Sequence, residues 1–200
     1  VAFGGASLAC VLIYILAWHD GVDPVRIILS GVAINTVLGA YNAFLQMLNS
    51  DNLSNVLAFM NGSLSGCNWE QLYVISAYSL IGLICGFACI KSANILQLGD
   101  EMASGLGVNV SRVRILLSAV GAFLAAATVS VAGMIGFIGL VVPHIARMMV
   151  GSDYRALLPV STLLGAFLLL AADTLGRTLV TGMEIPVGII MAATGGPFFL

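Results

Sequence analysis

The sequence predicts an all-α polytopic membrane protein, a helical bundle of about seven membrane segments. Two observations lead to this fold class. The chain is 60% hydrophobic and only 8% charged, whereas soluble globular chains carry roughly a quarter charged residues. Its apolar residues also form long stretches, and a helix needs about 20 such residues to cross the hydrocarbon core of a membrane. The net charge of −2 is too small to indicate nucleic acid as a partner.

The apolar stretches place the membrane segments in order along the chain. The first stretch is already under way at residue 1, which is Val and not Met, so we expect a fragment of a larger protein, entered part-way. A short amphipathic stretch at residues 56–60 lies in the long polar region after the second segment. The predicted segments are residues 1–18, 25–48, 71–90, 115–131, a short helix ending near residue 150, 157–180 and a last span that starts at Pro186.

The charge-free run at residues 115–142 is too long for one membrane helix and too short for two full spans. Gly133, Gly136 and Gly139 recur every third residue in its second half, and Pro143 follows. We therefore predict a span to about residue 131, a glycine-rich turn, and then a short helix. Irregular backbone at this depth must be buried in protein or line an aqueous cavity.

The basic residues predict the orientation of these segments. Six of the seven Lys and Arg residues fall in the loops at residues 19–26, 91–114 and 147–156, which alternation places on one face. Positive residues are retained on the cytoplasmic side of a membrane. Arg177 is then the only external cation. The six cytoplasmic ones are Arg26, Lys91, Arg112, Arg114, Arg147 and Arg155.

A polar stripe runs along the second segment, within an arc of about 80° at 100° per residue. Amide side chains that face lipid are costly, so the stripe must face other helices or water. One alternative is interhelical hydrogen bonding with close glycine packing. A continuous column without charge favours the other, a translocation pathway for a bulky polar solute. The stripe consists of Gly31, Asn35, Gly39, Asn42, Gln46 and Asn49.

The most charged region, residues 91–114, is expected to form two short amphipathic helices outside the membrane. Asp100 can cap one of them, which ends at Gly107 and carries an apolar face. These faces either pack against the cytoplasmic ends of the bundle or form a docking surface for a soluble partner. The apolar residues are Ile95, Leu96 and Leu98 in one helix, and Met102, Ala103 and Leu106 in the other.

Asp173 and Arg177 stand four residues apart near the external end of their span. They can form a self-contained ion pair on one helix face. Alternatively, Arg177 can serve an acidic external partner, because no other cation lies on that side. The spacing does not separate these two interpretations.

An enzyme function finds no support in the sequence. No G-x-x-x-x-G-K-[ST] phosphate loop is present, and no HExxH motif or nucleophile–base pair. Cys85 and Cys89 share a helix face without a His or carboxylate beside them, so a metal site is not expected there. His144 has no second ligand at metal spacing and is expected to be a buried histidine. We expect no metal and no cofactor.

Three runs of the sequence stand out, and the two C-terminal ones are distinctive in combination. The three runs are LGDEMASGLGVNV from Leu98 to Val110, GMIGFIGLVVPHIARMMVGSDYRALLPVSTLLGAFLLLAADTLGRTL from Gly133 to Leu179, and EIPVGIIMAATGGPFFL from Glu184 to Leu200. The last two closely resemble the FecCD-type permeases of bacterial ABC importers, which carry iron–siderophores, haem or vitamin B12. The first resembles the cytoplasmic coupling loop of that family. The resemblance covers essentially all 200 residues.

This resemblance implies one permease domain over residues 1–200, matching helices four to ten of a ten-helix, multi-pass subunit of the bacterial cytoplasmic membrane. The implied partners are an ABC ATPase subunit on the cytoplasmic side, an extracytoplasmic substrate-binding protein, a second permease copy in a homodimer, and membrane lipid. The implied function is translocation of an iron–siderophore type chelate, powered by the ATPase. Haem or cobalamin is the alternative cargo, and an ion-coupled secondary transporter is the rival class.

The resemblance also implies roles for particular residues. Arg177 matches an arginine that pairs with an acidic residue of the binding protein, which favours the second interpretation of that residue. The translocation pathway at the dimer axis would be lined by Asn35, Gly39, Asn42 and Gln46. The coupling loop at residues 91–112 would contact the ATPase through Leu98, Gly99, Asp100, Glu101, Ala103, Leu106 and Gly107.

Overall fold

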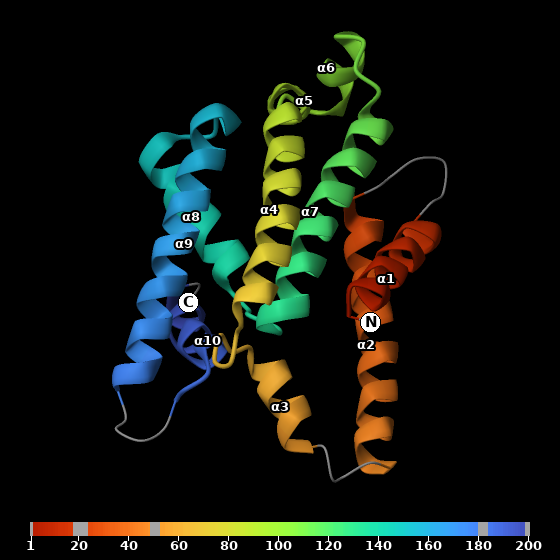
Figure 1. Cartoon of the computed structure of the whole chain (residues 1–200). Helices are drawn as coiled ribbons and strands as arrows, with labels where there is room; N and C mark the ends of the chain where they lie inside the picture. Colours follow the sequence, from red (N-terminus) through yellow and green to blue (C-terminus); the bar gives the residue numbers. More distant parts are fainter. Residues whose placement is uncertain (1, 18–23, 49–52, 180–183, 199–200) are drawn as a thin grey trace. The chain divides into compact units, whose positions relative to one another are not determined.

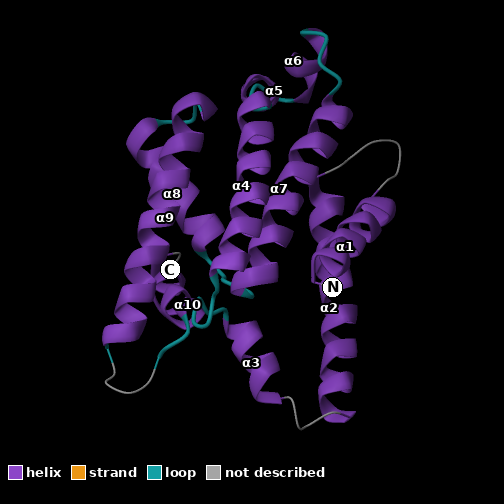
Figure 2. Ribbon diagram, viewed as in Figure 1, coloured by secondary structure: helices purple, strands orange, loops and turns teal. Residues whose placement is uncertain are grey.

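The computed structural model describes residues 2–17, 24–48, 53–179 and 184–198, and every regular element within these ranges is a helix (Figure 2). The predicted all-α fold is thereby confirmed. In chain order the helices are α1 (Ala2–Ala17), α2 (Pro24–Leu48), α3 (Leu53–Asn61), α4 (Trp69–Ala88), α5 (Ile90–Leu96), α6 (Asp100–Gly105), α7 (Val110–Ala132), α8 (Ile138–Val150), α9 (Tyr154–Thr178) and α10 (Val187–Phe198).

Seven of the described helices are apolar, and they correspond to the seven predicted membrane segments. Helices α2, α4, α7 and α9 are long enough to cross a membrane, whereas α1, α8 and α10 are shorter. The other three, α3, α5 and α6, are the short helices predicted in the two polar regions. Helix α3 begins at Leu53, earlier than the predicted amphipathic stretch at residues 56–60.

Two of the long helices begin earlier than predicted because polar side chains cap them. The Asn109 side chain accepts the backbone N–H of Arg112 at 3.0 Å, so α7 starts at Val110 and not at residue 115. The Asp153 side chain accepts the N–H of Arg155 at 2.9 Å, so α9 starts at Tyr154 and not at residue 157. Such caps satisfy backbone donors that a helix leaves unpaired in its first turn.

The described residues divide into two compact units, of which the first contains Val1–Val56 and Ile81–Ser130. In this unit α1 packs against α2, and α5 packs against α6 (Figure 1). Gly82 of α4 lies against the side chain of Leu124 in α7, where an added Cβ would collide with it. Close approach of two membrane helices commonly depends on small residues of this kind.

The second unit contains Leu57–Leu80 and Val131–Leu200. Helix α8 packs against α9, and α10 packs against both, as the blue and teal ribbons of Figure 1 show. Its buried core consists of Ala172, Val187 and Met191, with Leu64, Ile135, Ile138, Leu169 and Ile190 packed around them. The core therefore joins α9 and α10 to the segment between α7 and α8.

The predicted glycine-rich turn is present between α7 and α8, and protein backbone covers it. The N–H of Met134 donates to the carbonyl of Phe59 at 3.1 Å, and the N–H of Ser63 donates to the carbonyl of Ala132 at 2.9 Å. Gly133 has a φ of +71°, and a Cβ there would collide with the Phe59 carbonyl. The end of α3 and the residues after it thus supply hydrogen-bond partners to the irregular backbone of the turn, which lipid could not supply.

The start of α10 joins the same arrangement. The N–H of Gly188 donates to the carbonyl of Gly62 at 3.2 Å, and a Cβ on Gly188 would collide with the carbonyl of Asn61. Gly62 itself has a φ of +64°, a conformation that favours glycine. We refer to residues 59–63, 132–134 and Gly188 as the glycine junction.

Candidate functional site

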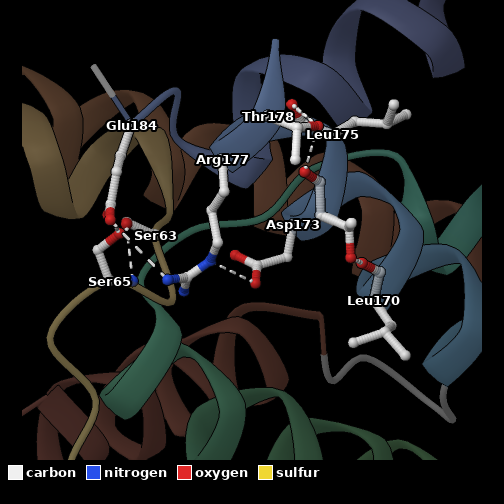
Figure 3. Close-up of polar contacts among 9 residues, drawn as sticks. Ser63, Ser65, Leu170, Asp173, Leu175, Arg177, Thr178 and Glu184 are labelled. Carbon is white, nitrogen blue, oxygen red and sulfur yellow. Dashed lines mark hydrogen bonds and ion pairs between the residues drawn. The ribbon is translucent and has the colours of Figure 1, made fainter. Parts of the chain in front are cut away.

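The first candidate site is a charged cluster at the end of α9, formed by Asp173, Arg177, Glu184 and Ser65 (Figure 3). The Nε of Arg177 donates to Asp173 Oδ2 at 2.9 Å. On its other side, Arg177 Nη1 lies 3.9 Å from Glu184 Oε1. The Ser65 hydroxyl donates to the second carboxylate oxygen of Glu184. All four residues belong to the second unit.

Glu184 lies beside α9 because the backbone that follows it contacts Gly176 of that helix. The N–H of Ile185 donates to the carbonyl of Gly176 at 3.1 Å. An added Cβ on Gly176 would come within 2.6 Å of the Ile185 carbonyl oxygen. Gly176 therefore lets the segment that leads into α10 lie directly against the last turn of α9, next to Arg177.

The ion pair between Asp173 and Arg177 that the sequence predicts is present, but it leaves much of the arginine accessible. The Arg177 side chain is 46% exposed, while that of Asp173 is 19% exposed. A guanidinium carries five N–H donors, so one hydrogen bond through Nε leaves the outer nitrogens able to bind another carboxylate. The helix pair and a docking role for Arg177 are therefore compatible.

Sequence reasoning did not find two members of the cluster. Glu184 directly follows residues 181–183, which lie outside the described part of the chain. The available signal was an acidic residue six positions after the end of α9. Ser65 lies 119 residues from Glu184, and no sequence pattern indicated their contact.

The second candidate site is the region of α5 and α6, where the two predicted short helices are present. The expectation that Asp100 caps α6 is wrong. Gly99 holds the cap position with a φ of +95°, and no side chain caps the helix there. Asp100 is instead the first helical residue, and its Oδ1 accepts a hydrogen bond from Arg114 Nη2 at 2.8 Å. This ion pair ties the start of α6 to the first turns of α7.

Helix α6 ends at Gly105, and Gly107 follows it in the left-handed conformation with a φ of +80°. The N–H of Gly107 donates to the carbonyl of Ser104 at 2.9 Å, and the N–H of Val108 donates to the carbonyl of Ala103 at 3.1 Å. This pair of bonds is a Schellman motif, which closes helices in front of such a glycine. The predicted stop at Gly107 thus has a specific geometry.

The two sides of α6 differ in exposure. Ala103 is fully buried, so it packs inside the chain and does not contribute to an exposed face. Leu98, Met102 and Leu106 are all more than half exposed, and Glu101 is exposed beside them. Of the three apolar residues predicted on α6, Met102 and Leu106 are exposed, and Leu98, which was predicted on the other short helix and precedes α6, is exposed as well. We call Leu98, Met102 and Leu106 the α6 apolar face.

The third candidate site is the polar stripe of α2. Asn35, Gly39 and Asn42 are exposed in the chain, whereas Gly31 and Gln46 are half-buried. The side-chain amides of Asn35 and Asn42 make no hydrogen bond to another described residue. The interhelical hydrogen bonds of the first sequence interpretation are thus not made by these two amides within the described chain. Asn49, the last member of the stripe, lies outside the described residues.

The structure also bears on metal binding and on His144. Within the described residues, no group of three His, Cys, Asp or Glu side chains is arranged to hold a metal ion. His144 is exposed and not buried, contrary to the sequence expectation. Its ring stands edge-on to that of Phe198, with the ring centroids 5.8 Å apart.

Comparison with known proteins identifies the family to which the chain belongs. A family model described as the FecCD transport family matches residues 1–200. The chain is 42% identical over 199 residues to the Fe(3+)-citrate import system permease protein YfmD of Bacillus subtilis (strain 168), covering 100% of this chain and 60% of the relative. It is 43% identical over 198 residues to the hemin transport system permease protein HmuU of Yersinia pestis, covering 98% of this chain and 59% of the relative.

A third relative and a solved structure extend the comparison. The cobalamin import system permease protein BtuC of Halobacterium salinarum is 42% identical over 200 residues, covering all of this chain and 54% of that protein. The structure, described as a metal-chelate type ABC transporter in an inward-facing conformation, matches with a TM-score of 0.84 and 29% identity, covering 98% of this chain and 62% of that one. The chain thus spans somewhat more than half the length of its relatives.

Proposed function

Because the chain belongs to the FecCD transport family, we propose that it is the membrane-spanning permease subunit of an ABC importer that carries an iron–siderophore type metal chelate. A separate ATPase subunit supplies the energy, and the permease is a multi-pass protein of the bacterial cytoplasmic membrane. The observation that carries this proposal is similarity along the whole chain to permeases named for iron–citrate, hemin and cobalamin import. Haem or cobalamin is the alternative cargo.

The polar stripe of α2 supports a translocation pathway. Asn35 and Asn42 expose uncharged amides on one side of the helix, and Gly39 between them leaves space for a bulky solute. A second permease copy would face this stripe and complete the pathway in a homodimer. Amides can exchange hydrogen bonds with a polar chelate without holding it through charge, which suits passage more than storage.

The α6 apolar face supports contact with the ATPase. Exposed apolar residues on a helix outside the membrane need a partner to cover them, and an ATPase subunit is a partner of the right kind. Asp100 joins α6 to α7 through Arg114. A movement of α6 on ATP binding is therefore passed to a membrane helix, and the pathway helices change which side is open.

Arg177 supports docking of an extracytoplasmic binding protein. Its outer nitrogens are accessible beside the exposed carboxylate of Glu184, and an acidic side chain of the binding protein would pair with them. Most of the selectivity for the chelate then belongs to the binding protein. The permease contributes no bond-making chemistry.

The rival class, an ion-coupled secondary transporter, would need a charged coupling site inside the membrane. In the described membrane helices, Asp173 is the only acidic residue beyond a first helical turn, and it is paired with Arg177. This arrangement favours the ABC importer.

The proposal is tested by uptake into proteoliposomes that hold the permease with its ATPase and binding protein. We expect ATP-dependent uptake of a ferric siderophore, with haem and cobalamin assayed in parallel. In a background whose native cysteines are replaced, Asn42→Cys should let a water-soluble thiol reagent block uptake. Replacing Leu163, an exposed apolar residue of α9, by Cys serves as the matched control. ATP-independent uptake, driven by an ion gradient alone, would contradict the proposal.

A further inference from the structure

The charged cluster at the end of α9 holds Arg177 between two carboxylates that differ in their position in the chain, their distance from the guanidinium and their exposure (Figure 3). Asp173 comes from the same helix, accepts a hydrogen bond from Nε at 2.9 Å, and is 19% exposed. Glu184 comes from the segment before α10, approaches Nη1 only to 3.9 Å, and is 56% exposed. One acid therefore binds the arginine firmly, and the other only approaches it.

We propose that Glu184 is an internal competitor for the docking arginine. In the undocked permease its carboxylate occupies the open side of the Arg177 guanidinium, and an acidic side chain of the binding protein takes that place on docking. This inference rests on the proposed docking role of Arg177. Two carboxylates at the same edge of one guanidinium repel each other, so the internal one must move away for the external one to bind.

The geometry explains why Glu184 can be displaced. A separation of 3.9 Å is longer than a hydrogen bond, and exposed ion pairs of this kind are weak. The Ser65 hydroxyl donates to the other carboxylate oxygen of Glu184, so the carboxylate keeps a partner when it leaves Arg177. Ser65 thus gives Glu184 a resting position within reach of the arginine.

Asp173 has the opposite role, that of a positioning residue. Its hydrogen bond to Nε restrains the guanidinium, and on the other side Nη1 faces Glu184 at 3.9 Å. A planar guanidinium presented in this way binds a carboxylate with two parallel hydrogen bonds. Loss of Asp173 would free the arginine to adopt other rotamers, and docking would then have to order it.

The test compares two single-charge changes within the cluster, Glu184→Gln and Asp173→Asn. The affinity of the binding protein is measured for the assembled transporter in detergent or nanodiscs. We expect Glu184→Gln to tighten binding about two- to fivefold, since it removes one weak exposed ion pair, and Asp173→Asn to weaken it. General electrostatic attraction would shift both in the same direction, because each removes one negative charge near the docking surface. High salt should reduce the gain from Glu184→Gln.

Arg177→Gln separates failure of this inference from failure of the docking proposal. If Arg177→Gln leaves affinity unchanged, the docking role of Arg177 is wrong. If it weakens binding while Glu184→Gln has no effect or weakens binding too, docking stands and the competitor role is overturned. A double variant that combines Glu184→Gln with Arg177→Gln should lose the gain in affinity seen in Glu184→Gln alone, since that gain acts through Arg177. Persistence of the gain in the double variant would also overturn the inference.

Discussion

The α5–α6 region and the charged cluster at Arg177 present their functional groups in different ways. At α6 the exposed groups are apolar, and the helix that carries them is held by the Asp100–Arg114 ion pair and by buried Ala103. At Arg177 the exposed group is one guanidinium, oriented by Asp173 on its own helix. Apolar contact has no preferred direction, so the whole helix must be placed. A hydrogen bond between charged groups is directional, so the orientation of a single side chain must be fixed.

The glycines near the two sites also have different roles. Near Arg177, Gly176 lets the segment before α10 lie against α9, and the glycine junction fixes the start of α10 against the end of α3. At α6 the glycines serve only as helix ends, at Gly99 and Gly107. The comparison therefore predicts that glycine changes act most strongly in the second unit, and that changes of apolar surface act most strongly at α6.

The largest expected effect comes from Gly188→Ala, which breaks the glycine junction. A methyl group there collides with the Asn61 carbonyl, and overpacking against backbone costs about 1–3 kcal/mol or more. We expect a lower free energy of unfolding, measured by denaturant titration in detergent. Gly139→Ala is the matched control, because its Cβ meets no atom within 4 Å in the described chain. Equal losses in both variants would show that the junction is not tightly packed.

The next effect is that of Leu106→Asp on the α6 apolar face. A buried carboxylate at a contact that excludes water is costly, and losing one central contact typically weakens an interface by about tenfold. We expect binding-protein-stimulated ATP hydrolysis to fall by that factor while the permease still inserts in the membrane. Leu106→Met keeps an apolar side chain of similar volume and should behave as the unchanged chain. Full hydrolysis linked to transport in Leu106→Asp would place the ATPase contact elsewhere.

The smallest of these effects is expected for Asp100→Asn, which removes the ion pair that holds α6 to α7. The Arg114 side chain is only 20% exposed. Loss of the ion pair should therefore lower the stability of the α6–α7 contact by about 1 kcal/mol, somewhat more than loss of a fully exposed ion pair. We expect a few-fold lower ratio of chelate transported to ATP hydrolysed. Exchanging the two charges, by Asp100→Arg with Arg114→Asp, should restore part of that ratio.

Arg112→Gln is the control for this change, because Arg112 is an exposed cation in the same turn of α7. It has no ion-pair partner among the described residues. If Asp100→Asn and Arg112→Gln give the same coupling ratio, the ion pair does not position α6.

Much of this fold could be predicted from local patterns in the sequence. Hydropathy located the seven apolar helices, and the recurrence of glycine before Pro143 located the turn between α7 and α8. Both signals are local, because the pattern of apolar residues that predicts a helix lies within a few turns of its own sequence. Helix starts were less accurate, since Asn109 and Asp153 act as caps through side-chain geometry that hydropathy ignores.

The direction in which α6 faces illustrates where local patterns fail. Met102 and Ala103 are neighbours and were assigned to one apolar face, yet Met102 is exposed and Ala103 is fully buried. Asp100 was assigned as a cap from its residue type, and its carboxylate bonds instead to a residue of the next helix. A short helix has too few turns for periodicity to distinguish its buried side from its exposed side.

The order and apolar character of the membrane helices could be read from the sequence, and the four-residue spacing of Asp173 and Arg177 offered an ion pair as one of two interpretations. Only tertiary packing decided which glycines had to be glycine: Gly133 and Gly188 lie against carbonyl groups, whereas Gly136 and Gly139 have open space around them. Packing likewise brought Ser65 to Glu184 across 119 residues. Contacts between distant segments depend on how whole helices stack, and stacking leaves no periodic trace in the sequence.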